Sequence, residues 1–134
     1  MVWPFVIVVG AVVLSFVVMR YRAAHGGPSM TSAELVGRLE RNDCLVLDVR
    51  SADEYSSGHI PGARNVPHHQ VARRLEELKS YRDKDIAVCC EVGLRAHMAR
   101  KVLAKAGFEH VYHLTGDMAG WRREGLPLHT GATP

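Results

Sequence analysis

The stretch that most constrains this chain is residues 85–96, an apolar run that ends in a cysteine and continues through a glycine-containing loop to an arginine. A buried strand that leads into a helix is the unit from which parallel sheets are built. It would place Cys90 at the amino end of the helix, where free N–H groups and the helix dipole stabilise a thiolate. Arg95 adds a permanent positive charge and a forked donor. The stretch therefore predicts an anion site that contains a nucleophile.

A separate apolar segment begins at Val2, ends at Met19 and contains no charged residue. As a helix, its roughly 18 residues would span about 27 Å, close to the thickness of a bilayer's hydrocarbon core. Arg20 and Arg22 follow this segment, whereas a cleavable signal peptide begins with basic residues. We therefore expect an uncleaved transmembrane anchor over residues 1–22. The positive-inside tendency would then place the amino terminus outside and the C-terminal domain in the cytoplasm.

Charge and cysteine content narrow the range of partners. The chain has 134 residues, with 17 Lys and Arg against 14 Asp and Glu. Because Arg20 and Arg22 belong to the anchor, the rest of the chain is almost balanced, and no basic stripe with interleaved aromatic residues indicates nucleic acid. Three cysteines, two of them adjacent, do not form a disulfide framework and suit a reducing compartment. The histidines lack the spacing of a metal site, so we expect no metal and no cofactor.

The remaining residues predict one α/β domain. Residues 23–30 have the composition of a linker, and we assign residues 31–134 to the domain. Strands are expected at 44–49, just before Pro67, at 86–89 and at 111–114. Helices are expected after Thr31 or Ser32, after Ser51, and over about 68–81, 95–106 and 117–123. Strands that alternate with helices indicate a mostly parallel sheet covered on both faces, with ligands bound at the carboxyl ends of its strands.

Two charged residues and two further cysteines belong to this predicted sheet. Asp48 and Arg50 end a buried strand, and we expect them to support the loops rather than to transfer protons. Side chains alternate along a strand, so Cys89 should point away from Cys90 into the core. Cys44 opens a buried strand and is also expected in the core.

Taken together, the motifs resemble those of the rhodanese (sulfurtransferase) domain family over about residues 31–128. The resemblance rests on Leu-Asp-Val-Arg at 47–50, Glu-Tyr at 54–55, Gly-His-Ile-Pro-Gly-Ala at 58–63, the Cys90 loop, Gly116, Trp121 and Gly-Leu-Pro-Leu at 125–128. It implies a rhodanese-like sheet and a single-domain, membrane-anchored sulfurtransferase. Cys90 would take sulfane sulfur from thiosulfate, another small anionic donor or a protein persulfide. It would hold the sulfur as a persulfide and pass it to a thiol or cyanide-type acceptor.

The resemblance also assigns roles within the loop. The residues implied in binding the substrate anion are Glu91, Val92, Gly93, Leu94 and Arg95. Four residues separate Cys90 from Arg95. Phosphatases that share this fold have five and a wider cradle, so the resemblance favours sulfur over phosphate.

Three positions depart from the family pattern. Ala96 replaces a common Ser or Thr, which predicts lower activity. The charge of Glu91 predicts that thiosulfate is a poorer donor than a persulfide. Asp117 follows Gly116 where a second glycine is usual, so the sequence does not predict the conformation of this turn. The alternative function is a catalytically weak or inactive rhodanese-like module that acts as a membrane-tethered binding and recruitment protein.

Overall fold

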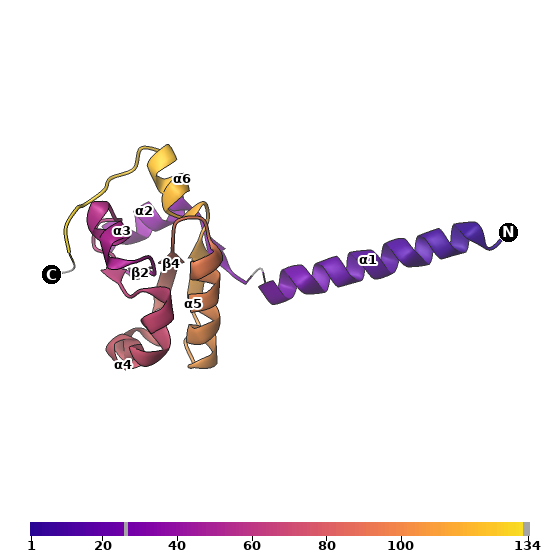
Figure 1. Ribbon diagram of the computed structural model, residues 1–134, viewed down its shortest axis with the longest axis horizontal. Helices are drawn as coiled ribbons and strands as arrows, with labels where there is room; N and C mark the ends of the chain where they lie inside the picture. The colour runs from indigo at the N-terminus through magenta and orange to yellow at the C-terminus, as the bar shows by residue number, and fades with distance from the viewer. Residues whose placement is uncertain (26, 133–134) are drawn as a thin grey trace.

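The computed structural model describes residues 1–25 and 27–132, with side chains placed for residues 1–20 and 27–132 (Figure 1). The helices and strands occur in this order: α1 (Trp3–His25), β1 (Ser29–Met30), α2 (Ser32–Glu40), β2 (Cys44–Asp48), α3 (Ala52–Ser57), β3 (Arg64–Asn65), η1 (His68–Arg73), α4 (Leu75–Leu78), η2 (Lys79–Tyr81), β4 (Asp85–Cys89), α5 (Leu94–Lys105), β5 (Val111–Leu114) and α6 (Asp117–Arg123). This order confirms the alternation of strands and helices expected from the sequence.

The strands form a five-stranded sheet in the order β1-β5-β4-β2-β3, and every neighbouring pair is parallel. Strand β4 lies at the centre, and its Cys89 pairs with Asp48 of β2. Because all strands run in one direction, their carboxyl ends meet at a single edge. Cys90 follows β4 at that edge, beside Asp48, as the sequence predicted.

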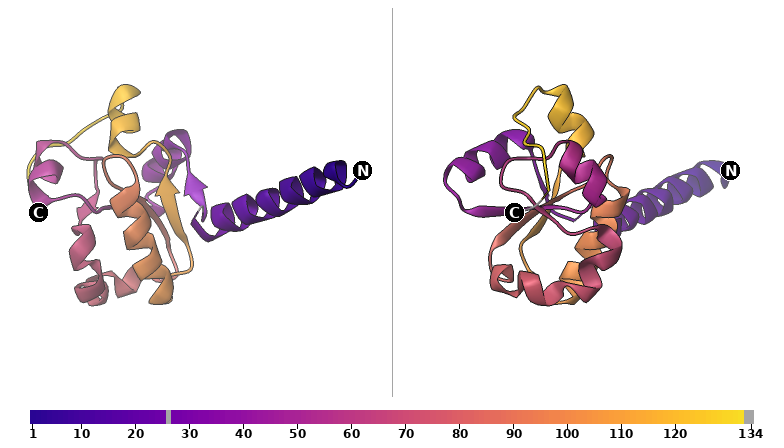
Figure 2. Two further views of the ribbon diagram at one scale, coloured as in Figure 1. Left: turned by 45° about the vertical axis from the view of Figure 1, so that its right-hand side comes forward. Right: turned by 60° about the vertical axis from the view of Figure 1, so that its left-hand side comes forward.

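Helices cover both faces of the sheet (Figure 2). On one face, residues from η1, α4 and α5 pack against Leu47, Val88 and their neighbours on the strands. On the other face, residues from α2, α3 and α6 pack against Val46, Ala87 and Cys89. Consecutive strand residues thus enter opposite cores, which is the alternation expected of a strand buried on both sides.

Two parts of the chain differ from the sequence expectation. The single helix expected over residues 68–81 is wrong, since this segment forms η1, α4 and η2 in succession. The inner positions expected from the sequence are nevertheless confirmed for Val71 and Leu78, because both side chains are buried. The expected linker, residues 23–30, is also partly regular: α1 continues to His25, and Ser29 and Met30 pair with β5. Gly26 of that linker lies outside the described residues.

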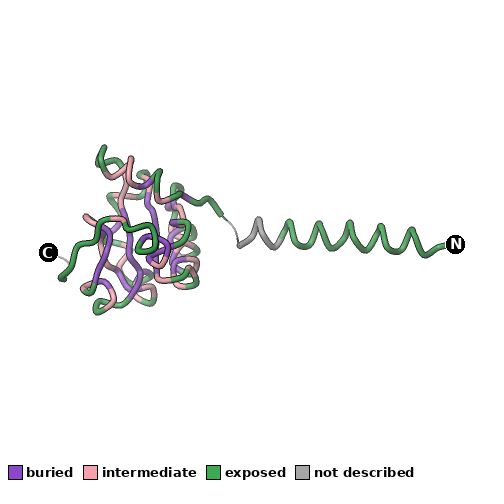
Figure 3. Tube along the Cα trace, turned by 90° about the horizontal axis from the view of Figure 1, so that it is seen from above, coloured by how far each residue is buried: buried purple, intermediate pink, exposed green. Residues whose placement is uncertain are grey.

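All the side chains described for helix α1, up to Arg20, are exposed (Figure 3). Its segment Trp3–Arg20 is long and apolar enough to cross a membrane. This assignment rests on length and composition only. A signal sequence near the amino terminus has the same length and composition. The side chain of Arg22 lies outside the described part.

Candidate active site

Cys90 lies directly after the last residue of β4 and is almost completely buried, with 1% of the residue exposed. The loop that follows turns back over the sulfur, so that the Gly93 N–H donates a hydrogen bond to Cys90 Sγ at 3.0 Å. This turn uses a φ of +122° at Gly93, a conformation that residues with a Cβ rarely adopt. Gly93 is also the residue that precedes α5, so the sulfur lies at the helix amino end, as expected.

Helix α6 holds the cysteine loop from the other side. The Met118 N–H donates to the Cys90 carbonyl at 2.9 Å, and the Ala119 N–H donates to the Glu91 carbonyl at 3.2 Å. The Cys90 N–H in turn donates to Asp117 Oδ1 at 3.0 Å. The first turn of α6 thereby satisfies three backbone groups of the loop and fixes its position relative to the sheet.

Asp117 is a residue whose role could not be inferred from the sequence. It is 2% exposed, and its carboxylate lies 2.9 Å from His113 Nε2 as well as accepting the Cys90 N–H. Its φ is +51°, in the region that glycine favours. The replacement of a usual glycine at this position was the available sequence signal, and the structure accounts for it: the turn keeps a glycine-like backbone while the side chain supports the loop.

Arg95 is in the first turn of α5 and is paired rather than free. Its two terminal nitrogens donate to the Glu54 carboxylate at 2.6 and 2.9 Å. The Arg95 hydrogen bonds, together with those from Ser51, lower the pKa of Glu54 to about 2. Ser51 and Glu54 also form the capping box of α3, so Arg95 joins that helix to the cysteine loop.

The charge of Glu91 is compensated in the structure, which corrects one argument from the sequence. Its carboxylate forms an ion pair with Arg122 and lies 3.7 Å from Arg50 Nη1. Two cations near this carboxylate offset the repulsion that we expected it to exert on a dianion. Glu91 therefore provides no electrostatic reason to expect that thiosulfate is a poor donor.

Asp48 and Arg50 form a buried ion pair behind the loop. Arg50 Nη2 donates to Asp48 Oδ2 at 2.7 Å and to the Gly58 carbonyl at 2.8 Å. The Asn65 side chain donates to the carbonyls of both Asp48 and Arg50. These contacts connect β2, the end of α3 and β3, which agrees with a supporting role.

The other cysteines lie away from the loop sulfur. Cys89 is buried on the opposite face of the sheet, and burial raises the pKa of its thiol well above the ordinary value, with Asp48 adding to the effect. Cys44 is half-buried at the start of β2, less enclosed than expected. All three cysteines are free thiols.

The loop presents an apolar rim to solvent. Val92 and Leu94 are 79% and 71% exposed. Within residues 1–25 and 27–132, no three His, Cys, Asp or Glu side chains are grouped so as to hold a metal ion. The arrangement is thus a buried thiol with a backbone donor, surrounded by apolar side chains and by paired charges.

Comparison with known proteins identifies this arrangement. Residues 31–124 match the family described as rhodanese-like domain. The chain is 41% identical over 106 residues to an HTH-type transcriptional regulator of Mycobacterium tuberculosis, a match that covers 78% of this chain and 46% of the regulator. It is 33% identical over 89 residues to a sulfurtransferase of Allochromatium vinosum, covering 66% of this chain and 81% of that protein.

A solved structure supports the same conclusion. The thiosulfate sulfurtransferase of Pseudomonas aeruginosa superimposes with a TM-score of 0.74 and 29% identity, covering 84% of this chain and 22% of that one. The family match spans more than half of the chain and includes strands β2 to β5, the cysteine loop and α6. The parallel sheet, the cysteine at its carboxyl edge and these similarities together show that the chain belongs to the rhodanese-like domain family.

Proposed function

We propose that the protein is a sulfurtransferase in which Cys90 carries sulfane sulfur as a persulfide. The observation that supports this most directly is the Gly93 N–H directed at Cys90 Sγ at 3.0 Å, at the amino end of α5. Such a donor and the helix dipole both favour a negative charge on sulfur, and the thiolate is the nucleophilic form of cysteine. The general transfer of sulfur is consistent with the family.

The proposed reaction has two displacement steps and no net redox change. The Cys90 thiolate attacks the outer sulfur of thiosulfate, the S–S bond breaks, and sulfite leaves with the bonding electron pair. A persulfide donor would react in the same way and release its thiolate. An acceptor thiolate or cyanide then attacks the terminal sulfur of the persulfide, and the Cys90 thiolate is regenerated.

The loop supplies the groups for the extra sulfur. The terminal persulfide anion would lie near the Gly93 N–H, and the other N–H groups between Glu91 and Arg95 would complete a concave set of donors. Arg95 would contribute positive charge while it remains paired with Glu54, so we assign it an orienting role in addition to anion binding. Asp48 and Arg50 would support the loop without touching the substrate.

The direct test is to detect the persulfide. The full chain in detergent is incubated with thiosulfate, or separately with glutathione persulfide, and the mass of the Cys90 peptide is measured. We expect a gain of one sulfur atom that cyanide removes as thiocyanate. Cys90→Ser should abolish the gain, while the matched variant Cys89→Ser should retain it. No sulfur on Cys90 with either donor would contradict the proposal.

A second candidate is a membrane-tethered recruitment protein without catalysis. It is favoured by the Arg95–Glu54 pair, because the guanidinium expected to bind an anion already has a carboxylate partner. Ala96, buried in the core without a hydroxyl, points the same way. If Cys90→Ser retained full function in cells, recruitment would be the better explanation.

A further inference from the structure

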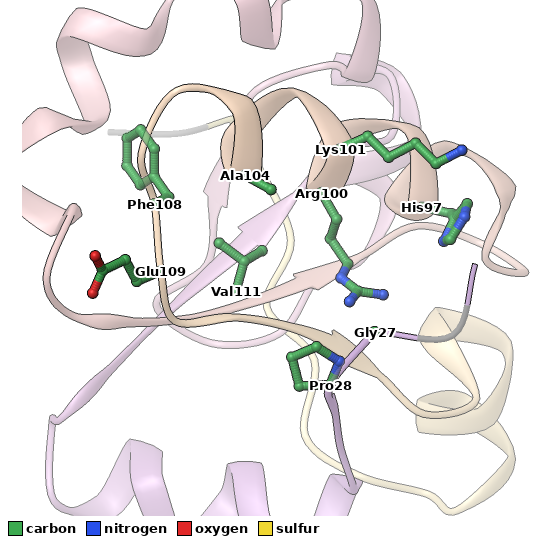
Figure 4. Close-up of a pocket in the computed structure, with 9 residues that line it drawn as sticks. All are labelled: Gly27, Pro28, His97, Arg100, Lys101, Ala104, Phe108, Glu109 and Val111. Atoms are coloured by element: carbon green, nitrogen blue, oxygen red, sulfur yellow. The ribbon is translucent and has the colours of Figure 1, made fainter. Parts of the chain in front are cut away.

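A cavity apart from the cysteine loop lies between helix α5 and the chain that follows α1, with basic side chains against a largely apolar lining. Its volume is about 260 Å³, and no residue of the cysteine loop lines it. Gly27 and Pro28 form one side, and Arg100 and Lys101 of α5 form another (Figure 4). Val111 of β5 lies at the base, so the cavity joins the sheet, one covering helix and the segment after α1.

Arg100 contributes an uncompensated charge to this cavity. Its Nε is buried and has no hydrogen-bond partner, and no carboxylate among the side chains described for residues 1–20 and 27–132 forms an ion pair with its guanidinium. Burial lowers the pKa of Arg100 below its ordinary value, and no described neighbour offsets that effect. A partly buried cation without a partner is unfavourable, and an anion beside it would remove the penalty.

The other charges around the cavity define the ligand. Lys101 lies on the same helix, next to Arg100 in sequence, and adds a second cation at the rim. The acidic lining residue Glu109 is at the opposite end, and its carboxylate points away from Arg100 (Figure 4). A guanidinium matches the oxygen spacing of a phosphate with two parallel hydrogen bonds. The volume is below the range of about 300–1,000 Å³ typical of drug-sized ligands, so a single small group fits.

We propose that this cavity binds a phosphate group, with Arg100 as the main donor and Lys101 as the second. The proposal does not depend on the chemistry of Cys90. The phosphate would belong either to a lipid headgroup or to a soluble phosphate. Gly27 and Pro28 follow closely on His25, the last residue of α1. A 23-residue helix is about 35 Å long, slightly more than a hydrocarbon core, so its carboxyl end would reach the headgroup layer.

The test measures ligand-induced stabilisation of the full chain in a non-ionic detergent. The midpoint of thermal unfolding is followed by circular dichroism at constant ionic strength as inorganic phosphate replaces chloride. A ligand that binds only the folded state raises the midpoint. We expect the apparent dissociation constant to rise about tenfold or more in Arg100→Gln, and by less in Arg100→Lys, which keeps the charge but loses the fork. Lys105→Gln, on the same helix but outside the cavity, is the charge-matched control and should bind as the parent does.

A second arm distinguishes the sources of the phosphate. Dioctanoyl phosphatidylglycerol is added to the micelles and compared with dioctanoylglycerol, which has the same chains without phosphate. Stabilisation by the phospholipid at concentrations where inorganic phosphate is ineffective assigns the site to lipid, and the reverse result assigns it to soluble phosphate.

Three results would overturn the proposal. One is the absence of stabilisation with both probes. Another is unchanged binding in Arg100→Gln, and the third is an equal loss in Arg100→Gln and Lys105→Gln, which would indicate general electrostatic attraction. If Arg100→Gln fails to fold, Arg100→Lys and Lys101→Gln are compared with Lys105→Gln under the same criteria.

Discussion

Asp117 combines two requirements that are usually met by different residues. Its backbone has a φ of +51°, which glycine adopts most readily, while its buried carboxylate accepts the Cys90 N–H and lies beside His113. The sheet edge therefore gains a support for the nucleophile at the expense of some backbone strain. Short polar residues tolerate this conformation better than other residues with a Cβ.

Replacing Asp117 separates the two effects. We expect Asp117→Gly to destabilise the protein by about 1–3 kcal/mol, because a buried backbone N–H loses its acceptor even though the backbone becomes unstrained. Asp117→Ala should cost a further 1–2 kcal/mol or so from its positive φ. Urea unfolding followed by the fluorescence of Trp121, which is buried in the same helix, measures both.

The matched control is Asn42→Gly. Asn42 is exposed and has nearly the same φ, +53°, so its replacement tests the release of strain alone. It should leave stability unchanged or raise it slightly. An Asp117→Gly variant as stable as the parent would show that the carboxylate contributes nothing to the loop.

Glu54 gives a pH dependence of defined sign. Its pKa is lowered to about 2 by the hydrogen bonds from Arg95, so the unfolded chain binds a proton on Glu54 more readily than the folded chain does. The stabilisation is complete above the unfolded pKa, ordinarily about 4.5, and is lost as the pH falls through the folded value. The carboxylate is 36% exposed, so solvent screening limits the contribution to about 1 kcal/mol.

The measurement compares the free energy of unfolding of the parent with that of Glu54→Gln between neutral pH and about pH 2. The parent should be more stable at neutral pH, and the difference should shrink as the solution is acidified below about 4.5. Glu76→Gln is a control on an exposed carboxylate. A difference between parent and Glu54→Gln that is independent of pH would contradict the predicted role of the ion pair.

For single residues, the sequence predicts where a residue lies in the fold better than it predicts which side chain it contacts. Cys90 at the end of a strand, and Asp48 with Arg50 at the same edge, followed from local pattern. The partnership of Arg95 with Glu54 did not, because 41 residues separate them and only the parallel sheet brings the amino ends of α3 and α5 together at its carboxyl edge. The same reason applies to the Cys90–Asp117 contact, which joins residues 27 positions apart.

Helices and strands are predicted correctly where the residues of the segment itself determine its structure. Thr31 and Ser51 accept hydrogen bonds from the backbone of α2 and α3 as the capping patterns indicated. Strand β1 has only two residues and no alternation to read, since it exists through its pairing with β5. The segment 68–81 does not form the single helix that its apolar pattern predicts. A seven-residue interval between buried residues, such as Val71 and Leu78, is compatible with one helix and also with successive short helices.

Gly93, at the junction between the loop and α5, controls both geometry and chemistry. A Cβ there would meet Asp117 Oδ2 at 3.2 Å in addition to the cost of the positive φ. Gly93→Ala should therefore shift the N–H that contacts Cys90 Sγ and slow persulfide formation by about tenfold or more, as loss of a donor to a developing anion does. Single-turnover kinetics with thiosulfate, read by mass spectrometry of Cys90, measures this rate.

Gly62→Ala provides the comparison. Gly62 also has a positive φ, +80°, but a Cβ there meets nothing within 4 Å. It should lose similar stability from strain and retain the parent rate of sulfur transfer. Equal rates in the two variants would remove the Gly93 amide from the proposed mechanism.

For the molecule as a whole, the cysteine content and the charges that follow the apolar segment are both consistent with a domain on the cytoplasmic side of a membrane. The three free cysteines are suited to a reducing compartment. Arg20 and Arg22 follow the apolar segment 2–19 within α1, and by the positive-inside tendency we expect the rhodanese-like domain on the cytoplasmic side. Gly27 and Pro28, which line the Arg100 cavity, follow that helix closely in sequence, so in the expected orientation a lipid ligand of the proposed site would belong to the inner leaflet.

Arg20 and Arg22 predict that the amino terminus lies outside and the C-terminal domain in the cytoplasm. The chain fused at its carboxyl end to alkaline phosphatase, which is active only outside the cytoplasm, should be inactive in bacteria, and the same fusion to green fluorescent protein should fluoresce. Because the bias rests on Arg20 and Arg22, replacing both by Gln and adding Val2→Lys should reverse the two readouts in a substantial share of molecules. A cleaved signal sequence would instead release the domain from the membrane fraction, and phosphatase activity in the parent fusion would refute cytoplasmic placement.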